Sequence, residues 1–91
     1  MIVRISGEGQ FRLADSETDR LNELERAVIA AVEGGDEGAY ASALEALLLE
    51  VRGGERLPED DLEGSDVILP PSDTTLAEAG GEFTGEGLIP D

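Results

Sequence analysis

The sequence predicts an α+β fold: an N-terminal β-hairpin packed on an antiparallel two-helix hairpin, followed by an extended strap and a short C-terminal helix. Three observations predict it. Residues 1–13 alternate polar and apolar side chains on either side of a glycine-containing turn, and residues 16–52 carry two apolar stripes at helical spacing. From residue 55 to residue 91 the composition shifts to proline, glycine and acids. The 91 residues are enough for a single small domain.

The β-arm, residues 1–13, contains two short runs that favour strands. Residues 1–5 are rich in β-branched side chains, and residues 10–13 alternate again after the turn. Gly7-Glu8-Gly9 lacks the lysine and the third glycine of phosphate-binding loops, so a tight turn is the simpler interpretation. Because an isolated hairpin is only marginally stable, its apolar residues should pack on the helices, or its edge should join another sheet. These residues are Val3, Ile5, Phe11 and Leu13.

The first predicted helix begins at Asp15 or Ser16, whose side chains can accept hydrogen bonds from the free N–H groups of a helix start. Charged residues, Glu25 among them, are expected on or beside the face opposite the apolar stripe. Gly34-Gly35 ends the helix, because glycine adopts the left-handed conformation without a Cβ clash. The stripe consists of Leu21, Leu24, Val28 and Ala31.

Asp36 can cap the second predicted helix, which Gly53-Gly54 ends. The short connection requires the helices to be antiparallel neighbours, so their stripes should face each other. A two-helix hairpin has a small core and should rely on the β-arm, on a second copy or on a partner helix. The second stripe consists of Tyr40, Ala43, Leu44, Leu47, Leu48 and Val51.

Residues 55–65 predict an acidic loop, with one helical turn after Pro58. Val67-Ile68-Leu69 should be extended, since prolines follow it. Two interpretations of this run remain open: a strap over the open side of the helix hairpin, or a strand that adds to a partner's sheet.

Ser72 or Asp73 can cap a short helix over residues 75–79, which Gly80-Gly81 would end. The tail, residues 82–91, has few apolar side chains among glycines and acids. Its sequence predicts no regular element.

The charge balance restricts the partners. The chain has 22 acids and 6 bases, a net charge of −16, and all its bases are arginine. Nucleic acid and anionic lipid should repel it, so we expect neither nucleic-acid binding nor direct membrane insertion. A halophilic source or a GC-rich genome would each explain acid enrichment without lysine.

The sequence also lacks the residues for several kinds of chemistry. Without cysteine or histidine, disulfides and the common zinc ligand sets are excluded. Neither histidine nor lysine is present to activate a nucleophile, and the acids at residues 59–61 do not match a calcium-binding loop. We expect no enzymatic activity, no cofactor and no metal. With no segment typical of a signal peptide or membrane span, the expected location is the cytoplasm.

Three segments of the chain resemble the PspA-associated (PspAA) family of archaea and actinobacteria. They are MIVRISGEGQFRL at residues 1–13, VILPPSD at residues 67–73 and GEGLIPD at residues 85–91. The helices between them are similar in pattern. The resemblance implies a non-enzymatic accessory protein that binds or regulates PspA, the membrane-remodelling coiled-coil protein of the phage-shock response. It also implies recruitment to the inner face of the membrane through that partner.

We expect the interaction surface on the β-arm and the strap. Four of the six bases lie in the first third of the chain, so this end is relatively positive and can meet an acidic partner; they are Arg4, Arg12, Arg20 and Arg26. Ion pairs with Glu8, Asp19 or Glu23 within the chain are the other interpretation. An alternative function is a self-assembling structural or regulatory module that makes no contact with PspA, its β-arms pairing edge to edge in a homodimer. The candidate interaction residues are Val3, Arg4, Ile5, Phe11, Arg12, Val67, Ile68 and Leu69.

Overall fold

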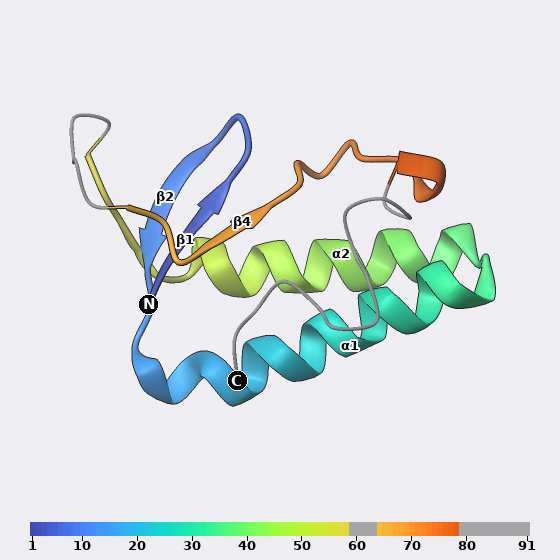
Figure 1. The fold of residues 1–91 in the computed structure, drawn as a ribbon, viewed down its shortest axis with the longest axis horizontal. Coiled ribbons are helices and arrows are strands. Elements are labelled where there is room, and N and C mark those ends of the chain that lie inside the picture. The colour runs from blue at the N-terminus through green and yellow to red at the C-terminus, as the bar shows by residue number, and fades with distance from the viewer. Residues whose placement is uncertain (59–63, 79–91) are drawn as a thin grey trace.

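The structure, a computed structural model, describes residues 1–58 and 64–78. It confirms the predicted α+β fold. Figure 1 shows the strands over one end of a helix pair and a short helix, residues 76–78, near the other end. The elements in chain order are β1 (Ile2–Ile5), β2 (Gly9–Arg12), a 3₁₀ turn η1 (Asp15–Glu17), α1 (Thr18–Gly34), α2 (Glu37–Arg52), β3 (Glu55–Arg56) and β4 (Val67–Leu69).

The strands form one mixed sheet in the order β3-β2-β1-β4. β1 pairs antiparallel with β2, placing Val3 opposite Phe11, so the predicted β-hairpin is confirmed. β1 also pairs in parallel with β4, placing Val3 beside Val67. The strap therefore covers the core as a strand of the chain's own sheet. Because β1 has partners along both edges, the predicted edge-to-edge pairing of β-arms cannot use this strand.

β3 was not predicted. Residues 55–56 were expected to begin the acidic loop, but they pair antiparallel with Phe11 and Arg12 of β2. Neither Glu55 nor Arg56 has the β-branched or aromatic character that favours a strand. Their pairing is set by the position of β2, which no local pattern reveals.

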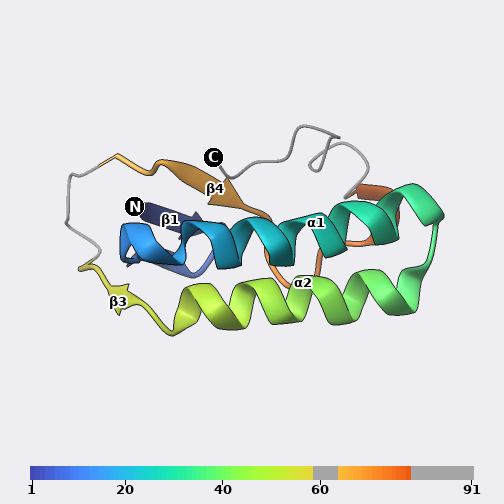
Figure 2. The same cartoon turned by 90° about the horizontal axis from the view of Figure 1, so that it is seen from below.

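The two helices lie antiparallel and side by side, as predicted (Figure 2). Gly35 has a left-handed backbone with φ of 67°, and its N–H donates to the Ala31 and Val32 carbonyls at the end of α1. Asp36 caps α2, its Oδ1 accepting from the Ala39 N–H at 3.0 Å. The predicted αα-hairpin is therefore confirmed, together with the glycine and the helix cap that form its turn.

The predicted cap of α1 is wrong. Neither Asp15 nor Ser16 accepts a capping hydrogen bond there, because both lie in the 3₁₀ turn that precedes α1. Asp15 instead lies beside the N-terminal ammonium of Met1, with Oδ1 3.4 Å from the nitrogen. The same ammonium donates to the Leu13 carbonyl at 2.9 Å, which fixes the start of the chain against the end of β2.

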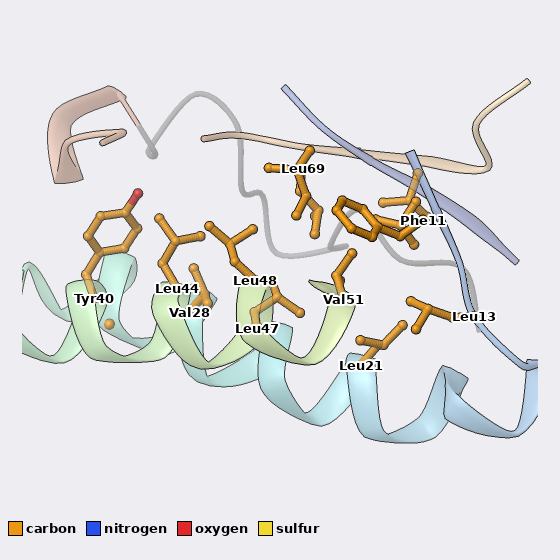
Figure 3. Packing of buried hydrophobic residues seen from close by; sticks show 14 residues of the cluster. Phe11, Leu13, Leu21, Val28, Tyr40, Leu44, Leu47, Leu48, Val51 and Leu69 are labelled. Carbon is orange, nitrogen blue, oxygen red and sulfur yellow. The ribbon is translucent and has the colours of Figure 1, made fainter. Parts of the chain in front are cut away.

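The core lies between the sheet and the helix pair. In Figure 3, Leu44, Leu48 and Val51 point from α2 toward the layer of the strands, and Phe11 and Leu69 point from the strands toward the helices. Both predicted helical stripes and the apolar residues of the β-arm contribute to this cluster. Its buried members are Val3, Ile5, Phe11, Leu13, Leu21, Val28, Ala31, Tyr40, Leu44, Leu47, Leu48, Val51, Val67 and Leu69.

Glu25 is the largest error in the predicted core. It was expected on or beside the polar face of α1, but its side chain is only 2% exposed. The helical spacing explains the error, because Glu25 stands four residues after Leu21 and three before Val28, within the apolar stripe itself.

The short helix is capped by Thr75 rather than by the predicted Ser72 or Asp73. The Glu78 N–H donates to Thr75 Oγ1 at 3.3 Å, and the Thr75 N–H donates to Glu78 Oε1 at 3.2 Å. This reciprocal pair is a capping box, and its Thr-x-x-Glu signature is visible in the sequence. The end of this helix at Gly80-Gly81, the tail and the turn after Pro58 lie outside the described residues.

Candidate protein-interaction surfaces

The structure divides the eight predicted interaction residues into two groups. Five apolar side chains are at most 5% exposed and hold the sheet against the helices, so the folded chain does not present them at its surface. These are Val3, Ile5, Phe11, Val67 and Leu69. Arg4, Arg12 and Ile68 are exposed, and they lie on strands whose buried side chains point to the core. The interaction itself stays a prediction for these three residues.

Arg4 and Ile68 are neighbours on adjacent strands, since the β1–β4 register pairs them directly. Next to them, Arg4 Nε donates to Ser65 Oγ at 3.4 Å, and Ser65 Oγ donates to Gln10 Oε1 at 2.6 Å. Gln10 is buried although it pairs with the exposed Arg4 in the β1–β2 register. The hydrogen bonds to neighbouring polar groups make this burial possible.

Leu57 directly follows β3, and Ser65 lies shortly before β4. Both residues contact Gln10. The Leu57 N–H donates to the Gln10 carbonyl at 2.9 Å, and the Leu57 side chain is 7% exposed. Together with the Ser65 contact, this covers Gln10 on the face of the sheet that points away from the helices. Open surface on that face therefore lies at Arg4, Arg12 and Ile68, around this covered centre.

One of the expected ion pairs is present, since Arg20 Nη1 lies 3.8 Å from Glu23 Oε2, but Glu8 pairs with an arginine that was not expected. Glu8 in the β1–β2 turn pairs with Arg52 of α2, whose Nε and Nη2 lie 2.9 and 2.8 Å from the two carboxylate oxygens. The hydrogen bond from Arg52 lowers the pKa of the Glu8 carboxyl below its usual value. Arg56 adds a hydrogen bond from Nη2 to the Glu8 carbonyl at 2.9 Å. No sequence signal connects Glu8 to Arg52, which lies 44 residues further along the chain.

Tyr40 connects α2 to the segment before the short helix. Its hydroxyl donates to the Thr74 carbonyl at 3.0 Å, while its ring is buried. Burial, and secondly the negative charge of Glu78, raise the pKa of Tyr40 above its usual value. The segment after the two prolines is thereby fixed to the helix pair.

Two large apolar side chains are strongly exposed among the described residues: Ile68, at 57%, and Leu49, at 64%. Leu49 was not among the predicted interaction residues. The signal was present in the run Leu47-Leu48-Leu49, because three consecutive residues of a helix cannot all face one core. Leu47 and Leu48 are fully buried, so Leu49 is the residue turned outward.

The described residues offer neither a cluster of metal ligands nor a helix that could span a membrane. Within residues 1–58 and 64–78, no group of three or more acids is placed to hold a metal ion. In the same ranges, no helix combines the length and the apolar character needed to cross a bilayer. The surface features that the structure does offer are the exposed residues on the sheet and Leu49 on α2.

Comparison with known proteins agrees with the resemblance seen in the three short segments. The family model described as PspA-associated protein, PspAA, matches residues 1–91, the whole length of the chain. No curated protein and no solved structure matches it significantly. The chain belongs to the PspA-associated protein (PspAA) family.

Proposed function

We propose that this chain is a non-enzymatic accessory protein that binds a PspA-type coiled-coil protein directly and regulates it in the phage-shock envelope stress response. The observation that carries the proposal is the whole-length match to the PspA-associated family. An association with PspA is the coarser property that the family name states. Direct binding and regulation are the steps that we add.

The described surface supports a protein partner. Leu49 and Ile68 are large apolar side chains exposed on a chain of which 31% is charged, and each would gain free energy when a partner covers it. The two lie on different elements, α2 and β4. A small scaffold with exposed apolar side chains on a charged surface suits an adaptor.

Direct binding is tested by titrating purified PspA, from the genome that encodes this chain, into the purified chain in a calorimeter. We expect saturable heat at micromolar concentrations and a complex that co-elutes in size-exclusion chromatography. Variants of Val3, Ile5 or Phe11 are unsuitable, because these side chains are buried and their loss would unfold the chain. The absence of heat and of a complex at micromolar concentrations would contradict direct binding.

Recruitment to the membrane is a separate part of the proposal. With a net charge of −16, the chain alone should not bind vesicles that contain anionic lipid. Vesicles that already carry PspA should retain it. Flotation of both mixtures measures this directly, and binding to bare anionic vesicles would show that the charge argument is wrong.

A second candidate is the self-assembling module, for which β4 offers an open edge. None of the other described strands pairs with this edge. Pro70 and Pro71 follow β4 directly, and proline has no N–H to donate, so the edge is short and poorly suited to extension. Multi-angle light scattering separates the candidates: a monomer at tens of micromolar argues against self-assembly, and a dimer that Ile68→Lys disrupts argues for it.

A further inference from the structure

Leu49 lies on the side of α2 that faces away from the core. Figure 2 shows α2 at the border of the molecule, with α1 along one side of it. Along this helix only Glu37 and Glu45 are charged among the exposed residues. α1 differs, since most of its exposed residues are charged. These are Asp19, Arg20, Glu23, Arg26 and Glu33.

A hollow of about 270 Å³ lies beside Leu49. Leu13, Ala14 and the glycines at residues 53–54 supply uncharged parts of its lining. The exposed Leu49 side chain therefore projects from the surface at the border of this hollow. A partner side chain seated in the hollow would cover Leu49 at the same time.

The charges around this surface are mostly negative. Glu17 and Glu50 line the hollow together with Arg12, and Glu45 lies one helical turn before Leu49. The Arg52 guanidinium, although near in sequence, is held by Glu8 and by Glu45, the latter at 3.4 Å. At longer range the whole chain contributes a net charge of −16.

The charge decides between two helical occupants. A second copy of the chain would bring another −16 charges and set Glu45 and Glu50 against like acids, which costs free energy. A helix with lysine or arginine beside its apolar stripe would gain from the same charges. A basic amphipathic helix is therefore the occupant that fits.

We propose that Leu49 and the hollow beside it, flanked by Glu45 and Glu50, are the docking site for a basic amphipathic helix of the partner protein. Apolar residues of that helix cover Leu49 and enter the hollow, in the manner of helix-in-groove recognition. Its basic residues lie along the two glutamates. The inference rests on the proposed function for the identity of the partner, but the chemistry of the surface stands on the structure.

The matched pair Leu49→Asp and Ala30→Asp tests the site in the calorimetric titration with PspA, because each variant adds one acid at an exposed position of a helix, α2 or α1. Both variants should keep the far-UV circular dichroism and nearly the thermal midpoint of the wild type. We expect Leu49→Asp to weaken binding about tenfold or more, and Ala30→Asp, which lies outside the docking site, to leave it within error. Unchanged binding by Leu49→Asp would overturn the docking site and leave the proposed function standing.

A second experiment tests the docking site without PspA. The ¹⁵N-labelled chain is titrated with a peptide of leucine and lysine at helical spacing, and with its leucine–glutamate counterpart. We expect amide shifts at Ala46, Leu49 and Gly53 with the lysine peptide, and these shifts should shrink as salt is added. Shifts confined to other residues, or equal shifts with both peptides, would overturn the inference. If the wild-type chain does not bind PspA but the lysine peptide shifts the amides around Leu49, the proposed function is wrong and the docking site for a basic helix is still supported.

Salt distinguishes the two occupants. Docking of a basic helix weakens as ionic strength rises, because screening removes the attraction. Pairing of two acidic copies through Leu49 would strengthen with salt, since screening removes their repulsion. A dimer in light scattering that grows with salt and disappears in Leu49→Asp would replace the basic helix with a second copy and overturn the inference.

Discussion

Arg52 in the last turn of α2 forms a two-point ion pair with Glu8 in the turn between β1 and β2, with nitrogen–oxygen distances of 2.9 and 2.8 Å. The pair ties the tip of the β-hairpin to the end of the helix pair. A two-point contact between a guanidinium and a carboxylate fixes orientation as well as distance. It therefore complements the non-directional apolar contacts of the core.

Glu8→Gln and Arg52→Gln should each lower the free energy of unfolding by about 1 kcal/mol, because both side chains are still about a third exposed to water. The double variant should lose less than the sum of the single losses, since it removes the same pair. Urea denaturation of the four proteins measures this coupling. Additive losses would contradict a direct interaction between the two side chains.

Acid should remove the contribution of Glu8. The Arg52 guanidinium holds the pKa of the Glu8 carboxyl below its usual 4.5, so the folded chain binds this proton less readily than the unfolded chain. The stabilisation is complete above the unfolded pKa and is lost as the pH falls through the folded pKa. The stability difference between wild type and Glu8→Gln should therefore be constant from neutral pH to about pH 5 and shrink below it. If the stability difference between wild type and Glu8→Gln grew as the pH fell, the lowered pKa of Glu8 would be contradicted.

Asp36→Ala should destabilise the chain by about 1 kcal/mol, because the Ala39 N–H loses its side-chain acceptor at the start of α2. Ser16→Ala is the matched control, since Ser16 makes no capping hydrogen bond to α1. Thermal unfolding of both variants gives the comparison. Equal losses would mean that Asp36 does not act as a cap.

Gly54→Ala should destabilise the chain. A Cβ at this position would lie 2.6 Å from Leu13 Cδ2 and 2.7 Å from the Arg12 carbonyl oxygen, and the backbone cannot yield cheaply. Gly34→Ala is the control, because it meets open space in the last turn of α1. It should raise stability by about 0.4–1 kcal/mol through the smaller entropy of the unfolded chain. A neutral Gly54→Ala would show that β2 does not approach residue 54 this closely.

Sequence periodicity was sufficient for the helix pair and its turn. The stripes, the left-handed Gly35 and the Asp36 cap are local properties, readable within a few residues of each position. The start of the short helix was equally readable, because Thr75 and Glu78 form a capping box. Ser72 and Asp73 are also residue types that favour helix caps, but neither has a glutamate three residues later to complete a capping box.

The sheet depends on contacts that no local pattern carries. The N–H of Ile2 donates to the Asp66 side chain at 2.7 Å across 64 residues of sequence. That long-range contact lies at the start of the β1–β4 pairing. Five of the eight predicted interaction residues are buried in the core for a related reason. Apolar side chains such as Val3 and Leu69 look the same in a sequence whether the chain's own helices or a partner cover them.

The most direct measurement is the calorimetric titration of purified PspA into the wild-type chain, followed by the same titration at raised salt. Direct binding predicts saturable heat at micromolar concentrations, and the charge of the chain predicts weaker affinity as salt rises. A flat titration together with separate elution of the two proteins would contradict the proposal that this PspA-associated protein binds PspA itself.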